Sequence, residues 1–219
     1  MAILAPSILS ADFADLGNDI KKTIQGGADY IHVDVMDGIF VPSISFGMPV
    51  IRSIRKVTDK YFDVHLMIDD PARYINEFKE AGADGLTIHA EACPDIEETL
   101  KKIKDAGMDP ALSIKPGTPV SEVTGYLGMV KMILIMSVEP GFGGQKIIPE
   151  TIEKVRELRK IIDDNKKDVL IEIDGGVNLE NVKDIVDAGV DVVVAGSAVF
   201  KNDVEANTRA FKRIIQSYN

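Results

Sequence analysis

A histidine and an aspartate stand two residues apart at the end of a short strand-like segment. The segment His32-Val-Asp34-Val-Met36-Asp37-Gly38 alternates polar and apolar residues and ends in Asp-Gly, which stops a strand. In a strand with a period of two, His32, Asp34 and Met36 project to one side. An imidazole beside a carboxylate forms half of a metal site. The rest of the chain must supply the other half.

The two other histidines of the chain also lie in strand-like segments. His65 belongs to Asp63-Val-His65-Leu-Met67, and His89 ends a later apolar run. Asp174 ends another and precedes two glycines. The predicted ligand set is His32, Asp34, His65 and Asp174. Two nitrogens and two oxygens suit one divalent ion, namely Zn²⁺, Fe²⁺, Mn²⁺ or Co²⁺. We interpret His89 as a partner behind this set or as a packed strand residue, and less readily as a fifth ligand.

A repeated phrase indicates the fold that positions these residues. Four segments share a Gly-x-Asp core, each after a helical stretch and before an apolar run: 26–29, 81–84, 106–109 and 188–191. The glycine suits a helix C-terminus, and the apolar run suits a buried strand. The four glycines are 55, 25 and 82 residues apart, near multiples of about 27, so the chain holds roughly eight βα units. We therefore expect a single (β/α)8 TIM barrel over residues 1–219. A doubly wound open sheet is the alternative.

Strands are expected at 3–9, 30–35, 62–67, 85–89, 110–114, 132–137, 169–173 and 192–195. Apolar residues at helical spacing follow the first, third, fourth, sixth and eighth of these strands and predict a helix after each. Asp70 and Pro71 predict an N-cap and first helical position for the helix after the third strand. Tyr74, Ile75 and Phe78 are expected on one face of that helix.

Glycines cluster after the last three strands. They stand in Gly143-Gly144, Gly175-Gly176 and Gly196-Ser197. Glycine lets backbone N–H groups approach a ligand, and the loops after strands 7 and 8 usually form the phosphate-binding site of this barrel. A phosphate site is therefore predicted there, with plain turn chemistry as the alternative. Segment 138–147 is interpreted as a mobile lid or an ordinary long loop.

Three methionines lie at or near strand ends on the same rim: Met36, Met67 and Met136. They are interpreted as an apolar floor that keeps water from a carbanion-like intermediate, although core filling is the usual role of methionine.

Composition excludes several kinds of protein. A net charge of −10 argues against nucleic acid as the main partner. The longest run without charged residues, 38–51, is too short for a membrane span and contains two prolines. Cys93 is the only cysteine, so no intramolecular disulfide is possible, and we interpret it as an inert, packed thiol. The N-terminus is a poor signal peptide, so a cytoplasmic protein is expected.

Long motifs along the whole chain resemble the ribulose-phosphate 3-epimerase family. They are Ala5-Pro-Ser-Ile-Leu-Ser10, His32 to Gly38, Asp63 to Met67, Lys115-Pro-Gly-Thr-Pro119, Met136-Ser-Val-Glu-Pro-Gly-Phe-Gly-Gly-Gln145, Asp174-Gly-Gly176 and Ala195-Gly-Ser197. The resemblance implies a metal-dependent TIM barrel of the ribulose-phosphate-binding type, which interconverts ribulose 5-phosphate and xylulose 5-phosphate in the pentose phosphate pathway. It also implies a homo-oligomer, either a dimer or a hexamer.

The resemblance also implies roles for individual residues. Asp34 and Asp174 match the acid/base pair, which moves the C3 proton through a metal-stabilised enediolate. Ser7 matches a substrate contact of the family. The full predicted substrate-binding set consists of Ser7, His65, Met36, Met67 and Met136. The phosphate-binding residues would be Gly143, Gly144, Gly175, Gly176, Gly196 and Ser197. Lys115 and Ser43 stand where asparagine is frequent, which bears on substrate contacts only.

Three other functions are weighed against this one. Allulose 6-phosphate, with one more carbon, is the alternative substrate of an epimerase. A metal-free barrel lyase or decarboxylase would need a lysine in an Asp-x-Lys-x-x-Asp arrangement, and the stretch from Asp34 to Asp37 has none. A non-catalytic sugar-phosphate binding protein need not keep both Asp34 and Asp174.

Overall fold

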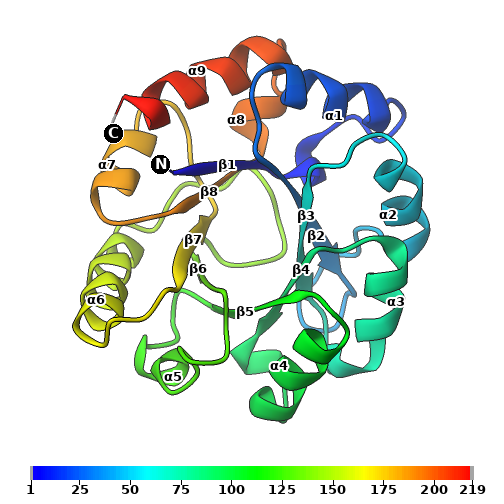
Figure 1. Ribbon diagram of the computed structural model, residues 1–219. Helices are drawn as coiled ribbons and strands as arrows, with labels where there is room; N and C mark the ends of the chain where they lie inside the picture. Colours follow the sequence, from blue (N-terminus) through cyan, green and yellow to red (C-terminus); the bar gives the residue numbers. More distant parts are fainter. Residues whose placement is uncertain (1, 218–219) are drawn as a thin grey trace.

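A ring of parallel strands forms the centre of the molecule. The computed structural model describes residues 2–217. Within this range eight parallel strands form one sheet, in the order β1-β8-β7-β6-β5-β4-β3-β2, with helices around it (Figure 1). A parallel bridge between Ser7 and His32 draws β1 against β2 and closes the ring. The predicted TIM barrel is confirmed. The strands are β1 Ile3–Pro6, β2 Tyr30–Met36, β3 Tyr61–Met67, β4 Gly85–His89, β5 Asp109–Ile114, β6 Met132–Met136, β7 Leu170–Asp174 and β8 Val192–Ala195.

Helices follow every strand. The α-helices are α1 Leu16–Gln25, α2 Met48–Arg55, α3 Ile75–Ala81, α4 Ile96–Asp105, α5 Ser121–Thr124, α6 Glu150–Asp164, α7 Val182–Asp187, α8 Ser197–Phe200 and α9 Val204–Gln216. Short 3₁₀ turns occupy η1 Ile8–Ser10, η2 Pro71–Tyr74 and η3 Ala90–Ala92. The repeated glycine ends its helix as expected. At α3, Gly82 has φ 106°, and its N–H bonds the carbonyls of Phe78 and Lys79.

One local prediction is wrong and a second is borne out only in part. The first strand ends at Pro6 rather than at residue 9, and the chain turns into η1, where the Ser7 hydroxyl accepts from the N–H of Leu9. Asp70 and Pro71 occupy the N-cap and the first helical position as predicted, but of the 3₁₀ turn η2 rather than of an α-helix, and Asp70, at φ 47°, makes no side-chain capping hydrogen bond. Tyr74 lies in η2 and is 36% exposed, while Ile75 and Phe78 lie in α3 and are buried.

The alternation of β2 separates two environments. Ile31, Val33 and Val35 belong to the large apolar core that also contains the buried helix residues. His32 and Asp34 face the barrel interior. Register then pairs His32 with Asp63 and Asp34 with His65 on β3. Side chains of paired residues on one face of a sheet are neighbours, so register alone brings these polar groups together.

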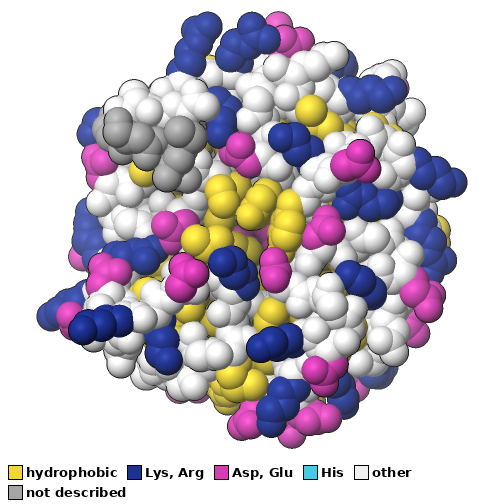
Figure 2. Space-filling view, viewed as in Figure 1, with side chains coloured by type: hydrophobic (Ala, Val, Ile, Leu, Met, Phe, Trp, Pro, Cys, Tyr) yellow, Lys and Arg dark blue, Asp and Glu magenta, His cyan; other side chains and the backbone are white. Residues whose placement is uncertain are grey.

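The surface differs in kind from this interior. Figure 2 shows one face, where side chains of both charges surround a central group of hydrophobic side chains. None of its described residues is a histidine, since all three histidines are fully buried. Among residues 2–217, no helix combines the length and the apolar character that crossing a membrane requires.

Candidate active site

The four predicted ligands meet at the mouth of the barrel. His32 and Asp34 come from β2, His65 from β3 and Asp174 from β7. Each offers one ligand atom, and these atoms all lie within 4.8 Å of one another. Asp34 is central: its Oδ1 lies 3.2 Å from Nε2 of His32 and 3.0 Å from Nδ1 of His65. The Ser7 hydroxyl donates to Oδ2 of Asp34 at 2.5 Å.

The hydrogen bonding of this cluster calls for positive charge, which either a protonated His32 ring or a bound cation can supply. Both nitrogens of His32 face carboxylates, since Nδ1 lies 2.6 Å from Oδ2 of Asp63. A neutral imidazole carries one N–H and can donate to only one of them. His32 and His65 also point to the same oxygen of Asp34. A positive ion between the rings and Asp34 would satisfy both, and the N2O2 donor set fits a divalent transition metal or zinc.

Charges within the cluster shift its pKa values in opposite directions. Burial disfavours the charged ring of His32, but Asp34 and Asp63 outweigh burial and raise its pKa well above the ordinary value. Burial likewise opposes ionisation of Asp34, yet His32 and His65 hold its pKa far below the usual range. Burial, with the charge of Asp34, raises the pKa of Asp174 to about 6. The carboxyl groups of Asp34 and Asp174 therefore differ in pKa, which suits a division of roles into base and acid.

A second acidic group lies deeper in the barrel, and the sequence analysis missed it. Asp63 and Glu172 are fully buried and meet His32, whose Nδ1 is 3.5 Å from Oε1 of Glu172. Burial and the charge of Asp63 raise the pKa of Glu172 well above its ordinary value. Each residue precedes a predicted ligand by two positions and so shares its strand face. The period of two that placed His32 beside Asp34 would have found both.

His65 has a buried partner on its other side. Its Nε2 lies 2.9 Å from Nε2 of His89, and Nδ1 of His89 lies 3.1 Å from Oε2 of Glu91. Burial lowers the pKa of His89 to about 4. Burial opposes ionisation of Glu91, but hydrogen bonds from His89, Thr118 and the backbone lower its pKa to about 2. His89 thus contacts His65 on the side away from Asp34. This position agrees with its interpretation as a partner behind the ligand set.

A cavity of about 770 Å³ opens beside the ligand set. Asp174 and Ser7 line it, whereas His32, Asp34 and His65 are 0–2% exposed. All three methionines line it and are buried. Every predicted phosphate residue also lines it: Gly143, Gly144, Gly175, Gly176, Gly196 and Ser197. The sequence thus anticipated both ends of one cavity.

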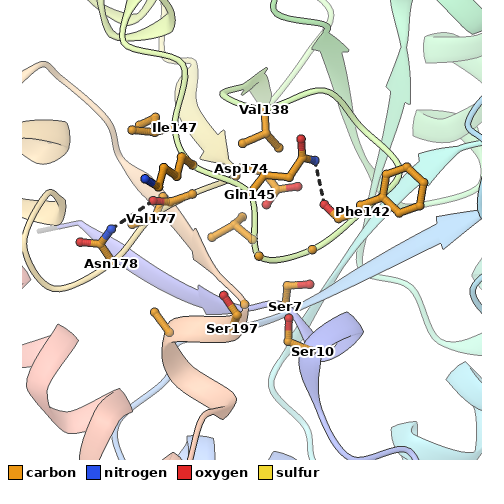
Figure 3. A pocket seen from close by; sticks show the side chains of 18 of the residues that line it. Ser7, Ser10, Val138, Phe142, Gln145, Ile147, Asp174, Val177, Asn178 and Ser197 are labelled. Carbon is orange, nitrogen blue, oxygen red and sulfur yellow. Dashed lines mark hydrogen bonds between the residues drawn. The ribbon is translucent and has the colours of Figure 1, made fainter.

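Figure 3 shows how this cavity is enclosed. Ser7, Ser10 and Ser197 lie along one edge, and Gln145 lies on the loop that crosses above them. Gln145 donates from its amide to the carbonyls of Glu139 and Phe142. These bonds fold the loop of residues 138–147 onto itself while the Phe142 ring is 60% exposed.

Other lining residues were not predicted. They include Asn178, Asn181, Lys146 and Lys201. These residues lie in loops or at element ends, where no periodicity marks a functional side chain.

The backbones of two loops approach each other closely at Gly176, because a Cβ there would stand 2.3 Å from the backbone nitrogen of Ile147. Its φ of +67° also disfavours any other residue.

Three residues that lie outside the ligand set make contacts typical of structural roles, namely Asp37, Lys115 and Cys93. Asp37 accepts from the N–H groups of Ile39, Phe40 and Asp69, which agrees with its predicted place in the turn. The Lys115 ammonium lies 3.8 Å from the centre of the Phe40 ring. Cys93 is buried, and burial raises the pKa of its thiol, as in an unreactive cysteine.

Comparison with known proteins gives one family. Residues 3–200 match the family model described as the ribulose-phosphate 3 epimerase family. A relative from Bacillus subtilis (strain 168), named ribulose-phosphate 3-epimerase, is 50% identical over 201 residues, which cover 91% of this chain and 93% of the relative. One of the same name from Aquifex aeolicus (strain VF5) is 44% identical over 218 residues, covering 99% and 98%. The resemblance seen in the motifs is confirmed.

Solved structures share the fold at much lower identity. A 3-hexulose-6-phosphate synthase from Salmonella typhimurium has a TM-score of 0.75 at 19% identity, covering 99% of this chain and 100% of that one. KGPDC from Streptococcus mutans has a TM-score of 0.72 at 14% identity, covering 99% and 98%. At these identities the likeness shows the barrel alone.

Proposed function

Since the chain belongs to the ribulose-phosphate 3-epimerase family and is an epimerase, we propose that it interconverts D-ribulose 5-phosphate and D-xylulose 5-phosphate. The observation that carries the proposal is the meeting of Asp34 and Asp174 beside two histidines, at the edge of a cavity with a glycine-rich far wall. Inverting a carbon next to a carbonyl group needs a base on one face and an acid on the other. Asp34 and Asp174 can serve as this pair, because they belong to different strands and meet at the same site.

The carboxyl pair approaches a ligand from two sides. β2 and β7 are three steps apart around the ring, so Asp34 and Asp174 flank whatever lies over the barrel mouth. One carboxylate takes the C3 proton to give an enediolate, and the other, carrying a proton, returns one to the opposite face. The unequal pKa values of the pair support this division of roles.

His32, Asp34, His65 and Asp174 would hold one divalent ion. When bound, the ion supplies positive charge that offsets the negative charge developing on the substrate. Ser7 holds the second oxygen of Asp34 and so fixes the carboxylate plane. The methionines Met36, Met67 and Met136 give the cavity an apolar lining, which keeps water from the carbanion-like centre.

The glycine-rich wall would bind the phosphate group. Backbone N–H groups at Gly176 and Gly196 are not covered by a side chain of their own, and Ser197 adds a hydroxyl. A phosphate held there places the other end of a sugar phosphate near Asp174, which lines the same cavity. The net charge of −10 is no obstacle, because these donors are local.

The wider setting follows from the same proposal. We assign the enzyme to the pentose phosphate pathway and to the cytoplasm, as a homo-oligomer. The lone, buried thiol of Cys93 is consistent with a reducing compartment.

The decisive experiment is turnover measured on ribulose 5-phosphate and allulose 6-phosphate with the bound metal assayed. We expect the pentose phosphate to be preferred. Stripping the metal should lower the activity at least about a hundredfold, and a divalent ion should restore it. Full activity in protein shown to be metal-free would overturn the metal-dependent scheme, and preference for the hexulose phosphate would replace the substrate.

A further inference from the structure

A line of contacts runs from the buried Asp34, through two buried imidazole rings, to Glu91 at the edge of the barrel. Nδ1 of His65 faces Oδ1 of Asp34 at 3.0 Å, and Nε2 of His65 faces Nε2 of His89 at 2.9 Å. Nδ1 of His89 then faces Oε2 of Glu91 at 3.1 Å. Both rings are fully buried, and among residues 2–217 each of these nitrogens has one hydrogen-bond partner, its neighbour in this line. Oδ2 of Asp174 lies farther from Nδ1 of His65, at 3.9 Å.

The far end of the line fixes the direction of every hydrogen bond in it. Oε1 of Glu91 accepts from the backbone N–H of Lys115 and from the Thr118 hydroxyl, and these bonds favour the ionised carboxylate, whose Oε2 is then an acceptor as well. His89 must then donate from Nδ1. A neutral imidazole has one N–H, so Nε2 of His89 carries a lone pair and accepts. The partner nitrogen, Nε2 of His65, must be the donor.

In the neutral ring of His65, Nδ1 is then left with a lone pair and no hydrogen. It points at Asp34, where two acceptors 3.0 Å apart repel each other unless positive charge lies between them. Metal ions bind the neutral imidazole through such a lone pair, and the hydrogen bond made by the other nitrogen decides which one is free.

We propose that Glu91 and His89 are positioning residues that fix His65 as the Nε2–H tautomer and so present its Nδ1 to the metal ion. The inference rests on the proposed function, because that ion is part of it. His32 is fixed in the opposite sense, since Asp63 lies 2.6 Å from its Nδ1 and leaves Nε2 facing Asp34. The two ligand histidines thus present different nitrogens to one carboxylate oxygen.

The proposal is tested on the full chain, stripped of metal and titrated with Zn²⁺ by calorimetry. Long-range ¹H–¹⁵N spectra of the Zn²⁺-loaded protein, labelled at histidine, report which nitrogen of each ring carries hydrogen. The chain has three histidines, so assignment by substitution is direct. We expect Nε2–H for His65 and Nδ1–H for His32 and His89.

Three variants separate hydrogen bonding from packing. H89L removes the acceptor, and we expect it to weaken Zn²⁺ binding 10- to 100-fold, the usual effect of losing a partner behind a metal ligand. H89Q restores an acceptor oxygen at similar reach and should bind within about threefold of the parent chain. Thr87→Val is the matched control. It lies on the same strand, is fully buried, and its hydroxyl has no hydrogen-bond partner among the described residues, so affinity should not change.

The outcomes are distinct. A parent chain that binds no Zn²⁺ would refute the proposed metal site itself. Zn²⁺ binding with Nδ1–H on His65 would refute the positioning role alone. So would folded H89L that binds as tightly as the parent, or folded H89Q that binds as weakly as H89L.

Discussion

The two ends of the cavity are built from different parts of the chain. At one end, His32, Asp34 and His65 are side chains of two neighbouring strands, and they are 0–2% exposed. At the other end, the wall consists of the loops after β6, β7 and β8, where glycines expose the backbone. Strand register places the first group, because Asp34 pairs with His65. The second group depends on how loops pack on each other, as where Gly176 meets Ile147.

This difference separates two tasks. A group that transfers a proton must be held to a fraction of an ångström, and a strand inside a barrel does so. A phosphate is recognised by several N–H groups that share the charge, so each contributes less. We therefore expect changes at the side-chain end to affect the chemical step and changes at the glycine end to affect binding. Three predictions test this contrast.

The largest effect is expected from Asp34→Asn and Asp174→Asn. Each should lower kcat by about 10³-fold or more in both directions, because general acid–base catalysis contributes about 10²- to 10⁴-fold and an amide cannot carry the proton. Turnover is measured from both epimers with the metal content assayed. Glu180→Gln is the control, since Glu180 lines the same cavity at the glycine end. A tenfold loss or less in either aspartate variant would contradict the two-base scheme.

A smaller effect is expected at the glycine end. Gly176→Ala introduces a Cβ 2.3 Å from the nitrogen of Ile147, at a φ of +67°. The resulting shift of the loop should raise KM about tenfold, or about 1.4 kcal/mol, and change kcat less. Gly144→Ala is the matched control, because Gly144 also has positive φ but a Cβ there would meet nothing within 4 Å. Equal effects of the two variants would remove packing as the cause.

The smallest effect concerns stability at the side-chain end. The pKa of Glu91 is lowered from 4.5 to about 2, so its ionised form stabilises the fold above pH 4.5, and this contribution is lost as the pH falls toward 2. Urea unfolding should show the difference between the parent chain and Glu91→Gln shrinking between pH 6 and pH 3.5, by less than about 1 kcal/mol, because one pKa unit is worth about 1.4 kcal/mol and solvent screens this partly exposed carboxylate. Glu122→Gln, at an exposed carboxylate, serves as the control. A difference that stays constant with pH would contradict the assignment.

The same contrast explains what the sequence could predict. Alternation and residue type were enough for His32, Asp34, His65 and Asp174, and the repeated glycine phrase was enough for the barrel. Asp63 and Glu172 obey the same alternation but were not recognised. The turn after Pro6, which brings the Ser7 hydroxyl to Asp34, depends on a contact between β1 and β2 that no local pattern encodes.

Loop residues were the least predictable. Asn178, Asn181 and Lys201 line the cavity through the folding of loops, and neither periodicity nor spacing distinguishes them from other polar surface residues. The helix start near Tyr74 was predicted incorrectly for a related reason. The backbone of Asp70 is left-handed, and the chain forms the 3₁₀ turn η2, which contains Tyr74, before the α-helix begins.

The closure of the ring through β1 has a consequence for synthesis. β1 leaves the ribosome first, yet its ladder partner β8 begins at Val192, near the end of the chain. His32, Asp34 and His65 emerge early, whereas Asp174 emerges only with β7. A growing chain therefore carries three quarters of its ligand set long before the fourth ligand or the closing strand exists. The activity can arise only after β7 and the closing strand β8 have both been made.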